Sequence, residues 1–388
     1  MAAETAARKG HSVRVFDQRR SPGRKFVLAG RGGLNMTHSE PLDDFLDRYG
    51  PERTHLEGAI RDFDPTALRE WADGLDERTF VGSSGRVFPK SFRAVPLLRA
   101  WLRRLRALGV TFHGEHRWTG WSEWGKRPAL TFADPTGQAT LVEYDAAVLA
   151  LGGPSWPRVG SDGSWVDILR LRGVPVSDLR SANCGVAVTW SAPHIERFAG
   201  EPMKNAAVIV EGAVVRGDPI ITRNGLEGGP VYAHSRRLRE SIEANGSAEL
   251  TVDLLPDLEI GDLVRRLVER KQKKKSLSTW LKRSGISPVG ISLMREVTNN
   301  DLPTDPDQLA ELAKGVVLEI TELAAIDRAI SCAGGVEWSA VDSTLKLAGV
   351  PNTWVVGEML DWEAPTGGYL LQAVFSTGRL AGALSAAA

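Results

Sequence analysis

The sequence has little of what marks several common classes of protein. Its 388 residues include two cysteines, Cys184 and Cys332, too few for a disulfide framework and without the spacing of a metal site. No apolar run approaches the roughly 20 residues of a membrane-spanning helix, and no signal-peptide core follows Met1. The 48 basic and 48 acidic residues cancel, so no net field favours nucleic acid or a membrane surface. We therefore expect a soluble, cytoplasmic protein with buried thiols.

The first residues that are present have the pattern of the second half of a βαβ unit. Residues 1–9 have helical spacing and end at Gly10, a typical helix C-cap. The segment "SVRVFD" then alternates like a strand and ends on Asp17. At that place in a dinucleotide-binding unit an acid binds a ribose diol, although an ordinary acidic strand end would have the same pattern. The preceding strand and a G-x-G-x-x-G turn are not in the sequence.

Three glycine-rich stretches have the composition of a ligand site. "GRKFVLAGRGGLN" (residues 23–35) lies in an expected loop of residues 18–40. It combines cations with glycines that permit the close approach of a ligand, although a solvated surface loop would have the same composition. "VLALGG" places a double glycine after a buried strand, where a ligand or merely a tight turn is expected. "VVGEMLDWEAPTGGYLLQA" leads from a strand that ends near residues 357–358, through a glycine-rich loop, into a helix that begins near Tyr369. The free N–H groups at this helix start favour an anion or an electron-rich ring over a helix docked only for stability.

The pattern of predicted strands, turns and helices changes near residue 178 and again near residue 332. Short strands with Gly, Pro and Asn turns lie between these points, together with helical segments. We predict a nucleotide-binding domain of residues 1–177 and 333–388 that is interrupted by an insertion of residues 178–332. Within the insertion we expect a small β-barrel at about 178–256 with a return near 316–332, and a helical part at about 257–315.

The order of these motifs resembles one family of flavoproteins. The stretches "PGRKFVLAGRGGLN", "LALGGPSWPRVGSDG", "SCAGGV" and "VVGEMLDWEAPTGGYLLQAVFSTGRLAG" are similar, over essentially the whole chain, to the HI0933-like or aminoacetone-oxidase-like NAD(P)/FAD-dependent oxidoreductases. The resemblance implies an α/β fold with a Rossmann-like FAD-binding domain of the two-dinucleotide-binding type. It also implies FAD as cofactor, a small-molecule substrate, and NAD(P)H or oxygen as redox partner.

The resemblance further implies a role for each matching stretch. Asp17 would hold the adenosine ribose, Gly357 and Glu358 the ribityl–pyrophosphate link, and residues 366–370 the isoalloxazine edge. The residues expected at the cofactor are Asp17, Arg24, Lys25, Gly30, Arg31, Gly32, Gly33, Asn35, Gly152, Gly153, Gly357, Glu358, Thr366, Gly367, Gly368, Tyr369 and Leu370. The sequence identifies neither a catalytic base nor a metal ligand. One departure from the family is Leu34, which stands where the family commonly has a cysteine.

Two other functions stay open at this point. Because the phosphate-binding turn is absent, the chain could be a truncated or non-catalytic relative that holds no FAD and acts as a binding module. Met1 would then be an internal methionine beside a gap in the sheet, with the cofactor site open on its pyrophosphate side. The basic run of residues 270–283, which contains Trp280, could bind nucleic acid, but a solvated helix face fits the zero net charge better.

Overall fold

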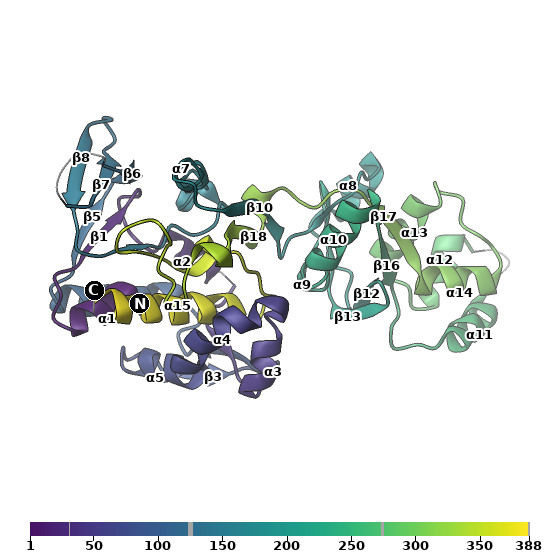
Figure 1. Cartoon of the computed structure of the whole chain (residues 1–388). Coiled ribbons are helices and arrows are strands. Elements are labelled where there is room, and N and C mark those ends of the chain that lie inside the picture. Colours follow the sequence, from purple (N-terminus) through teal and green to yellow (C-terminus); the bar gives the residue numbers. More distant parts are fainter. Residues whose placement is uncertain (31, 123–126, 273–274, 387–388) are drawn as a thin grey trace. The chain divides into compact units, whose positions relative to one another are not determined.

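The computed structural model describes residues 1–30, 32–122, 127–272 and 275–386. The chain divides into two compact units, each of which is described by itself (Figure 1). Unit 1 consists of Met1–Arg180 and Ser331–Ala388, and unit 2 of Ser181–Ile330. None of the helices in these described ranges has the length and apolarity that crossing a membrane requires.

Two parallel strand pairs lie in unit 1. β1 (Arg14–Asp17) pairs with β5 (Thr111–Gly114), and β9 (Ala147–Leu149) pairs with β19 (Thr353–Val355). In each pair, strands from distant parts of the chain run in the same direction, as the expected α/β class requires. Over the ranges that the structure covers, the two pairs form separate sheets with no ladder between them.

The remaining strands of unit 1 belong to smaller sheets. Two three-stranded antiparallel sheets have the orders β2-β4-β3 and β6-β7-β8, and β10 pairs with β18. Their bounds are β2 (Thr37–His38), β3 (Thr79–Val81), β4 (Arg86–Pro89), β6 (Arg117–Trp121), β7 (Ala129–Ala133), β8 (Ala139–Glu143), β10 (Val176–Ala182) and β18 (Ser331–Val336). Gly334 in β18 is required because a Cβ there would overlap the carbonyl oxygen of Asp178.

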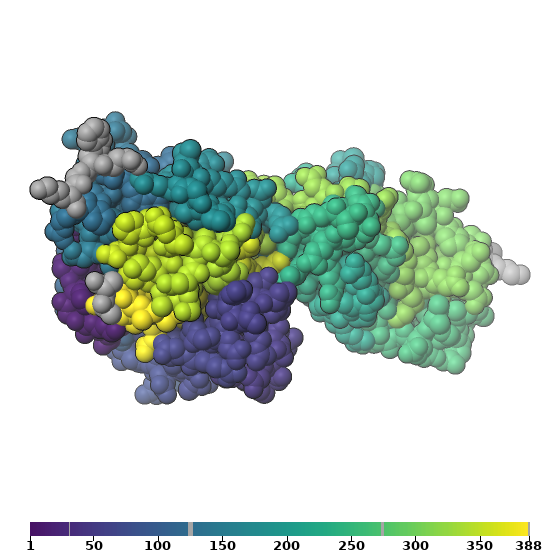
Figure 2. All heavy atoms as spheres, in the orientation of Figure 1, coloured from purple at the N-terminus to yellow at the C-terminus, as the bar shows by residue number. Residues whose placement is uncertain are grey.

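The C-terminal helix α15 (Tyr369–Ser385) packs against α1 (Ala2–Arg8) and α4 (Arg53–Asp62). Figure 1 shows α15 in yellow beside α1 in purple, and Figure 2 shows the surfaces of these chain ends side by side. Gly382 permits the close approach, because a Cβ there would overlap the backbone of Ala2. The other helices of unit 1 are α2 (Arg24–Ala29), α3 (Leu42–Asp47), α5 (Pro65–Asp73), α6 (Ala94–Ala107) and α7 (Trp165–Leu171).

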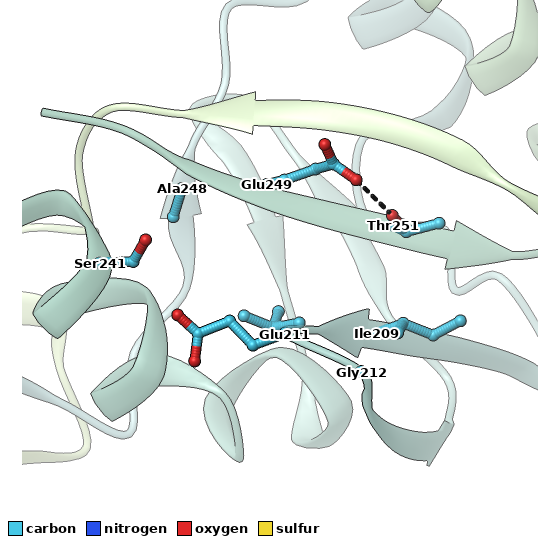
Figure 3. A pocket seen from close by; sticks show the side chains of 8 residues that line it. Ile209, Glu211, Gly212, Ser241, Ala248, Glu249 and Thr251 are labelled. Carbon is cyan, nitrogen blue, oxygen red and sulfur yellow. Dashed lines mark hydrogen bonds between the residues drawn. The ribbon is translucent and has the colours of Figure 1, made fainter. Parts of the chain in front are cut away.

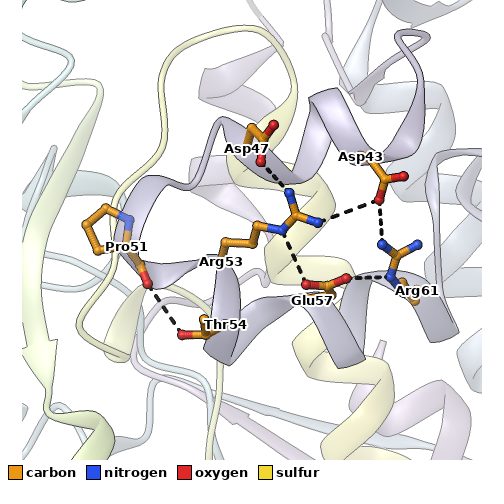
Figure 4. A network of polar contacts seen from close by, with 7 residues as sticks. All are labelled: Asp43, Asp47, Pro51, Arg53, Thr54, Glu57 and Arg61. Carbon is orange, nitrogen blue, oxygen red and sulfur yellow. Dashed lines mark hydrogen bonds and ion pairs between the residues drawn. The ribbon is translucent and has the colours of Figure 1, made fainter.

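An ion-pair network joins α3 to α4 (Figure 4). The Arg53 guanidinium contacts Asp47 and lies 3.2 Å from Glu57 Oε2, while Arg61 contacts Glu57 at 2.7 Å and Asp43 at 2.6 Å. Exposed pairs of this kind contribute only about 0.2–1 kcal/mol each. The network therefore adds little to stability, and α4 is also packed against α15.

Several local predictions are confirmed and two are wrong. The first helix ends before Gly10, which has φ +88°, and the last helix begins at Tyr369. The expected loop of residues 18–40 instead contains α2, because "RKFVLA" is a run of helix-compatible residues whose Phe26 packs on Trp101 and Phe375. The strand expected to end at residues 357–358 ends at Val355, and Gly357–Met359 is a 3₁₀ turn.

Unit 2 is built from two antiparallel sheets and a group of helices. The sheets have the orders β11-β15-β14 and β13-β12-β16-β17, and the apolar sides of their strands share one core with the helices. Its strands are β11 (Val186–Ala187), β12 (Ala206–Val210), β13 (Ala213–Gly217), β14 (Ile220–Thr222), β15 (Gly225–Glu227), β16 (Ala248–Asp253) and β17 (Val316–Ile320). Its helices are α8 (Ala192–Phe198), α9 (Gly229–Tyr232), α10 (Ser235–Asn245), α11 (Ile260–Arg270), α12 (Leu277–Arg283), α13 (Pro288–Val297) and α14 (Pro306–Lys314).

Candidate cofactor site

Three predicted residues meet around the peptide groups of Gly153. Lys25 Nζ donates a hydrogen bond to the carbonyl oxygen of Gly153 at 2.5 Å, and the Gly153 N–H donates to the carboxylate of Glu358. Gly153 follows β9 and Glu358 follows β19, so the parallel pairing of these two strands brings both residues to one edge. This is the carboxyl end of the strands, where open α/β sheets bind ligands.

The surroundings of this cluster shift the pKa values of its ionisable groups. Burial lowers the pKa of the Lys25 ammonium, and the charge of Glu358 opposes that shift. Burial raises the pKa of the Glu358 carboxyl, and Lys25 opposes that shift in turn. Burial also raises the pKa of the Cys332 thiol far above its usual range, so this thiol is not a thiolate nucleophile at neutral pH. The cluster is suited to holding a ligand rather than to attacking one.

The glycines of the same loop allow the chain to pass close to its neighbours. A Cβ on Gly153 would overlap the Sγ atom of Cys332, and Gly152 has φ +72°. The carbonyl oxygen of Gly152 accepts hydrogen bonds from Ser161 Oγ at 3.1 Å and Trp165 Nε1 at 2.9 Å. These contacts fix the path of the loop, so the double glycine is more than a turn signal.

A second group of predicted residues surrounds the start of α15. Gly367 and Gly368 have φ +140° and +103°, and a Cβ on Gly368 would lie 2.6 Å from the backbone of Thr37. Thr37 is fully buried, and its Oγ1 has no hydrogen-bond partner in the ranges that the structure covers. The Oδ1 atom of Asn35 is likewise buried without a described partner. Buried polar atoms almost always have partners, so these two atoms fit a polar ligand beside the helix N-terminus.

Tyr369 is held from three directions. Its hydroxyl donates to Glu40 Oε1 at 2.6 Å, its carbonyl oxygen accepts from the Tyr49 hydroxyl at 2.7 Å, and its ring stacks on His38. Burial and the negative charge of Glu40 raise the pKa of the Tyr369 hydroxyl well above its usual range. Burial alone would raise the pKa of Glu40, but hydrogen bonds from Arg48 and Tyr369 hold it below its usual value. The phenol is therefore a neutral anchor for the start of α15.

The other predicted residues of this region have hydrogen bonds or packing contacts of their own. Asp17, at the end of β1, accepts a hydrogen bond from the Arg19 N–H at 2.7 Å, and burial raises the pKa of its carboxyl. The N–H of Gly357 donates to Thr377 Oγ1 at 3.2 Å. Thr366 and Leu370 are half-buried, and Leu370 packs into the core around α15.

The predicted residues in the stretch 24–33 differ from one another in exposure and in the contacts that they make. Arg24 is exposed at the first turn of α2, and Gly32 is exposed with open space at its Cβ position. A Cβ on Gly30 would lie 2.6 Å from Ala94 Cβ, so this glycine permits the contact with α6. Gly33 lies against the ring of Phe92. The prediction for Arg31 falls outside the described residues.

Two features of the region were not predicted. The unpartnered hydroxyl of Thr37 has no local sequence signal, because its environment is made by residues from the other end of the chain. Phe92 has φ +61° and is 45% exposed, which is unusual for an aromatic residue in both respects. Neither a propensity nor a motif distinguishes Phe92 from an ordinary core phenylalanine.

A cavity of about 320 Å³ lies in unit 2 (Figure 3). β12 and β16 pair only as far as Ile209 and Thr251, and the opening follows where the two strands diverge. The cavity is lined by Ile209, Val210, Glu211, Gly212, Ser241, Ala248, Glu249 and Thr251. None of the predicted cofactor residues is among them.

The basic run of residues 270–283 begins at the last residue of α11 and ends with α12, and residues 271–272 and 275–276 belong to neither helix. Trp280 is 5% exposed, and its Nε1 donates to the carbonyl oxygen of Leu267 at 2.7 Å. Lys271 contacts the face of its ring. Trp280 is thus a core residue and not a platform for stacking bases; residues 273–274 lie outside the described ranges.

Comparisons with known proteins bear on the family and the fold of the chain. The family model described as HI0933-like protein Rossmann domain matches residues 1–384. The 3-dehydro-bile acid delta(4,6)-reductase of Clostridium scindens is 27% identical over 401 residues, covering 100% of this chain and 96% of the relative.

Solved structures with similar folds include two oxidoreductases. A flavocytochrome c3 fumarate reductase in an open conformation has a TM-score of 0.54 at 12% identity, covering 100% of this chain and 76% of that one. The 3-ketosteroid-delta4-(5alpha)-dehydrogenase of Rhodococcus jostii RHA1, in complex with 4-androstene-3,17-dione, has a TM-score of 0.50 at 13% identity, covering 99% and 94%. At these identities the similarity establishes the fold, which is of the Rossmann type.

Proposed function

The chain belongs to the HI0933-like family of flavin-dependent oxidoreductases, and from this premise we propose that unit 1 binds FAD and that the protein transfers electrons to or from a small organic substrate. NAD(P)H or oxygen is the proposed redox partner. We assign residues 1–177 and 333–388, which lie in unit 1, as the FAD-binding domain and residues 178–332 as its insertion. The observation that carries the proposal is the buried, unpartnered Thr37 hydroxyl beside the glycine-bounded start of α15.

Each residue group has a proposed task in holding the cofactor. Thr37, Asn35 and the free N–H groups at the start of α15 would hold the polar edge of the flavin ring, where the helix dipole favours negative charge. Lys25 and Glu358, aligned through Gly153, would hold the ribityl–phosphate portion. Asp17 would hold the adenosine ribose. Bound FAD would supply the two-electron chemistry that amino-acid side chains lack.

The proposed substrate class is taken from a relative that matches the whole chain. Its name describes a reductase that acts on a 3-dehydro-bile acid. We propose that this chain reduces a carbon–carbon double bond in a steroid-like ring system, with NAD(P)H rather than oxygen as the redox partner that supplies the two electrons. The protein's own part is to orient the substrate, exclude water and hold charge on the cofactor in place.

Cofactor retention by variants of Thr37 tests the proposal. The protein is incubated with FAD and freed of unbound flavin, and the retained flavin is measured from its visible absorbance and by titration of the flavin fluorescence. Wild-type protein should retain flavin, and Thr37→Val should weaken its binding by roughly threefold to tenfold, the value of one hydrogen bond.

The matched control is Thr353→Val. Thr353 is equally buried, but its hydroxyl already donates to the carbonyl oxygen of Pro351 at 2.9 Å. This substitution should leave flavin affinity unchanged. Wild-type protein that takes up no flavin would refute the proposed function, and equal affinities of wild type and Thr37→Val would refute the assignment of Thr37.

A further inference from the structure

Three phenylalanine rings form an aromatic platform on the β3–β4 hairpin and the turn after it. Phe80 and Phe88 are direct cross-strand partners, with ring centroids 5.9 Å apart. Phe92 stacks on Phe88 with centroids 4.8 Å apart and an interplanar angle of 8°. Phe92 is 45% exposed, so the stack ends in a ring face or edge that protein does not fully cover.

Phe92 is held in a strained conformation that its own burial does not explain. Its φ of +61° is rarely adopted by a bulky side chain. Its N–H donates to the carbonyl oxygen of Pro89 at 2.8 Å, and its carbonyl oxygen accepts from the Leu34 N–H at 3.1 Å. Strain of this kind persists where the surroundings impose it and is concentrated at functional sites. An exposed aromatic side chain gains little from folding, so burial does not account for this conformation.

The aromatic platform lies against the glycine loop that we assign to the cofactor region. A Cβ on Gly33 would lie 2.5 Å from Phe92 Cε1 and 3.4 Å from Phe88 Cε1. Only glycine permits this approach, because Gly33 also has φ +112°. A molecule on the aromatic platform would therefore lie beside residues 32–35.

Cations accompany the aromatic rings. The alternation of side chains along β3 and β4 places Arg78, Arg86 and Lys90 on the same face as Phe80 and Phe88. All three cations are exposed, and no ion pair of Arg78, Arg86 or Lys90 occurs among the described residues. The nearby acid, Glu77, accepts a hydrogen bond from Ser91 Oγ at 3.0 Å.

We propose that the aromatic platform, with Arg86 and Lys90, binds the substrate as an amphipathic anion: a flat apolar ring system that carries a carboxylate. Stacked aromatic rings provide a flat apolar surface, and exposed cations at its border complement a negative group. The inference rests on the proposed function, which it extends by stating how the substrate is recognised. It assigns a specificity role to Phe92, Arg86 and Lys90.

Two probes that share a ring system separate the apolar and ionic contributions. One is neutral 4-androstene-3,17-dione, and the other is the corresponding 3-keto-delta4 cholenoic acid, which adds a carboxylate. Their dissociation constants are measured by equilibrium dialysis with the full chain in excess FAD. Phe92→Ala should raise both constants about tenfold, the effect of losing roughly half a ring of apolar contact.

The cation variants should affect one probe alone. Arg86→Gln with Lys90→Gln should raise the dissociation constant of the acid about threefold to tenfold and leave that of the neutral steroid unchanged, and high salt should remove the difference. Leu171→Ala is the matched control for an exposed apolar side chain, because Leu171 is 88% exposed elsewhere in unit 1. Phe92→Gly also removes the ring, and glycine adopts the positive φ without strain. This variant therefore tests the ring even if Phe92→Ala folds poorly.

The outcomes separate this inference from the proposed function. If wild-type protein retains flavin but Phe92→Ala and Phe92→Gly bind both probes as wild type does, the aromatic platform is not the substrate site. Failure of wild-type protein to bind either probe also overturns the inference. A dimer in ultracentrifugation that Phe92→Ala converts to a monomer would make the platform a contact between copies. Wild-type protein without flavin that still binds probes in a Phe92-dependent way would refute only the proposed function.

Discussion

Replacement of Thr37 by valine is expected to move folding stability and cofactor affinity in opposite directions. The hydroxyl is fully buried and has no partner in the described part of the protein. A buried polar group without a hydrogen bond costs about 1–3 kcal/mol, and valine has nearly the same shape as threonine. Without flavin, Thr37→Val should therefore be more stable than wild type by about 1 kcal/mol.

Urea titration of flavin-free protein measures this change in the free energy of unfolding, and a thermal melt measures the matching change in melting temperature. A gain of about 1 kcal/mol corresponds to a rise in melting temperature of roughly 2–4 °C for a domain of 150–250 residues. Thr353→Val is the control with the opposite sign, because its hydroxyl donates to the carbonyl oxygen of Pro351. Removing that hydrogen bond should cost about 1 kcal/mol.

Equal changes in the stability of the two valine variants would contradict this prediction. Loss of stability in flavin-free Thr37→Val would mean that the hydroxyl already has a partner. A gain in stability without weaker flavin binding would mean that the hydroxyl is unpartnered but does not contact the cofactor. Only the combination of a more stable apoprotein and weaker flavin binding supports a hydroxyl reserved for a ligand.

Further predictions concern residues around the two clusters. Gly153→Ala should destabilise the protein by about 1–3 kcal/mol, because its Cβ would overlap the Sγ atom of Cys332. Adding Cys332→Ala should restore most of that loss in a double-mutant cycle, and additive losses would contradict the contact. The pKa of buried Glu4 is lowered by hydrogen bonds that outweigh burial, so its stabilisation is present above its ordinary pKa of 4.5 and lost as the pH falls. Glu4→Gln should therefore lower stability at neutral pH and flatten its loss in acid, as followed by urea titration at several pH values; an unchanged acid profile would argue against this. Tyr369→Phe removes a donor to Glu40, so the pKa of Glu40 should rise in a carboxyl NMR titration; an unchanged value would exclude the bond.

Local sequence signals determined the elements whose ends depend on a single residue type. Gly10 and Gly109, with φ of +88° and +82°, end the first helix and α6 because few other residues adopt that conformation easily. The glycine-rich loop before Tyr369 likewise marks the start of α15. The motif order also determined the family, since several stretches had to agree at once.

Tertiary contacts decided which of the predicted residues lie close together. Lys25, Gly153 and Glu358 are far apart in the sequence and meet because β9 pairs with β19 and α2 packs nearby. The helix in residues 24–29 was missed because its apolar side is stabilised by Trp101 and Phe375, which no local window contains.

The same reason explains the two features that the sequence did not disclose. An unpartnered hydroxyl at Thr37 and an exposed, strained ring at Phe92 are defined by neighbours and by backbone conformation, not by residue type. Sequence alone determined the family and the ends of several helices. The folded chain decided how the predicted residues group, because burial and hydrogen bonding depend on contacts between distant segments.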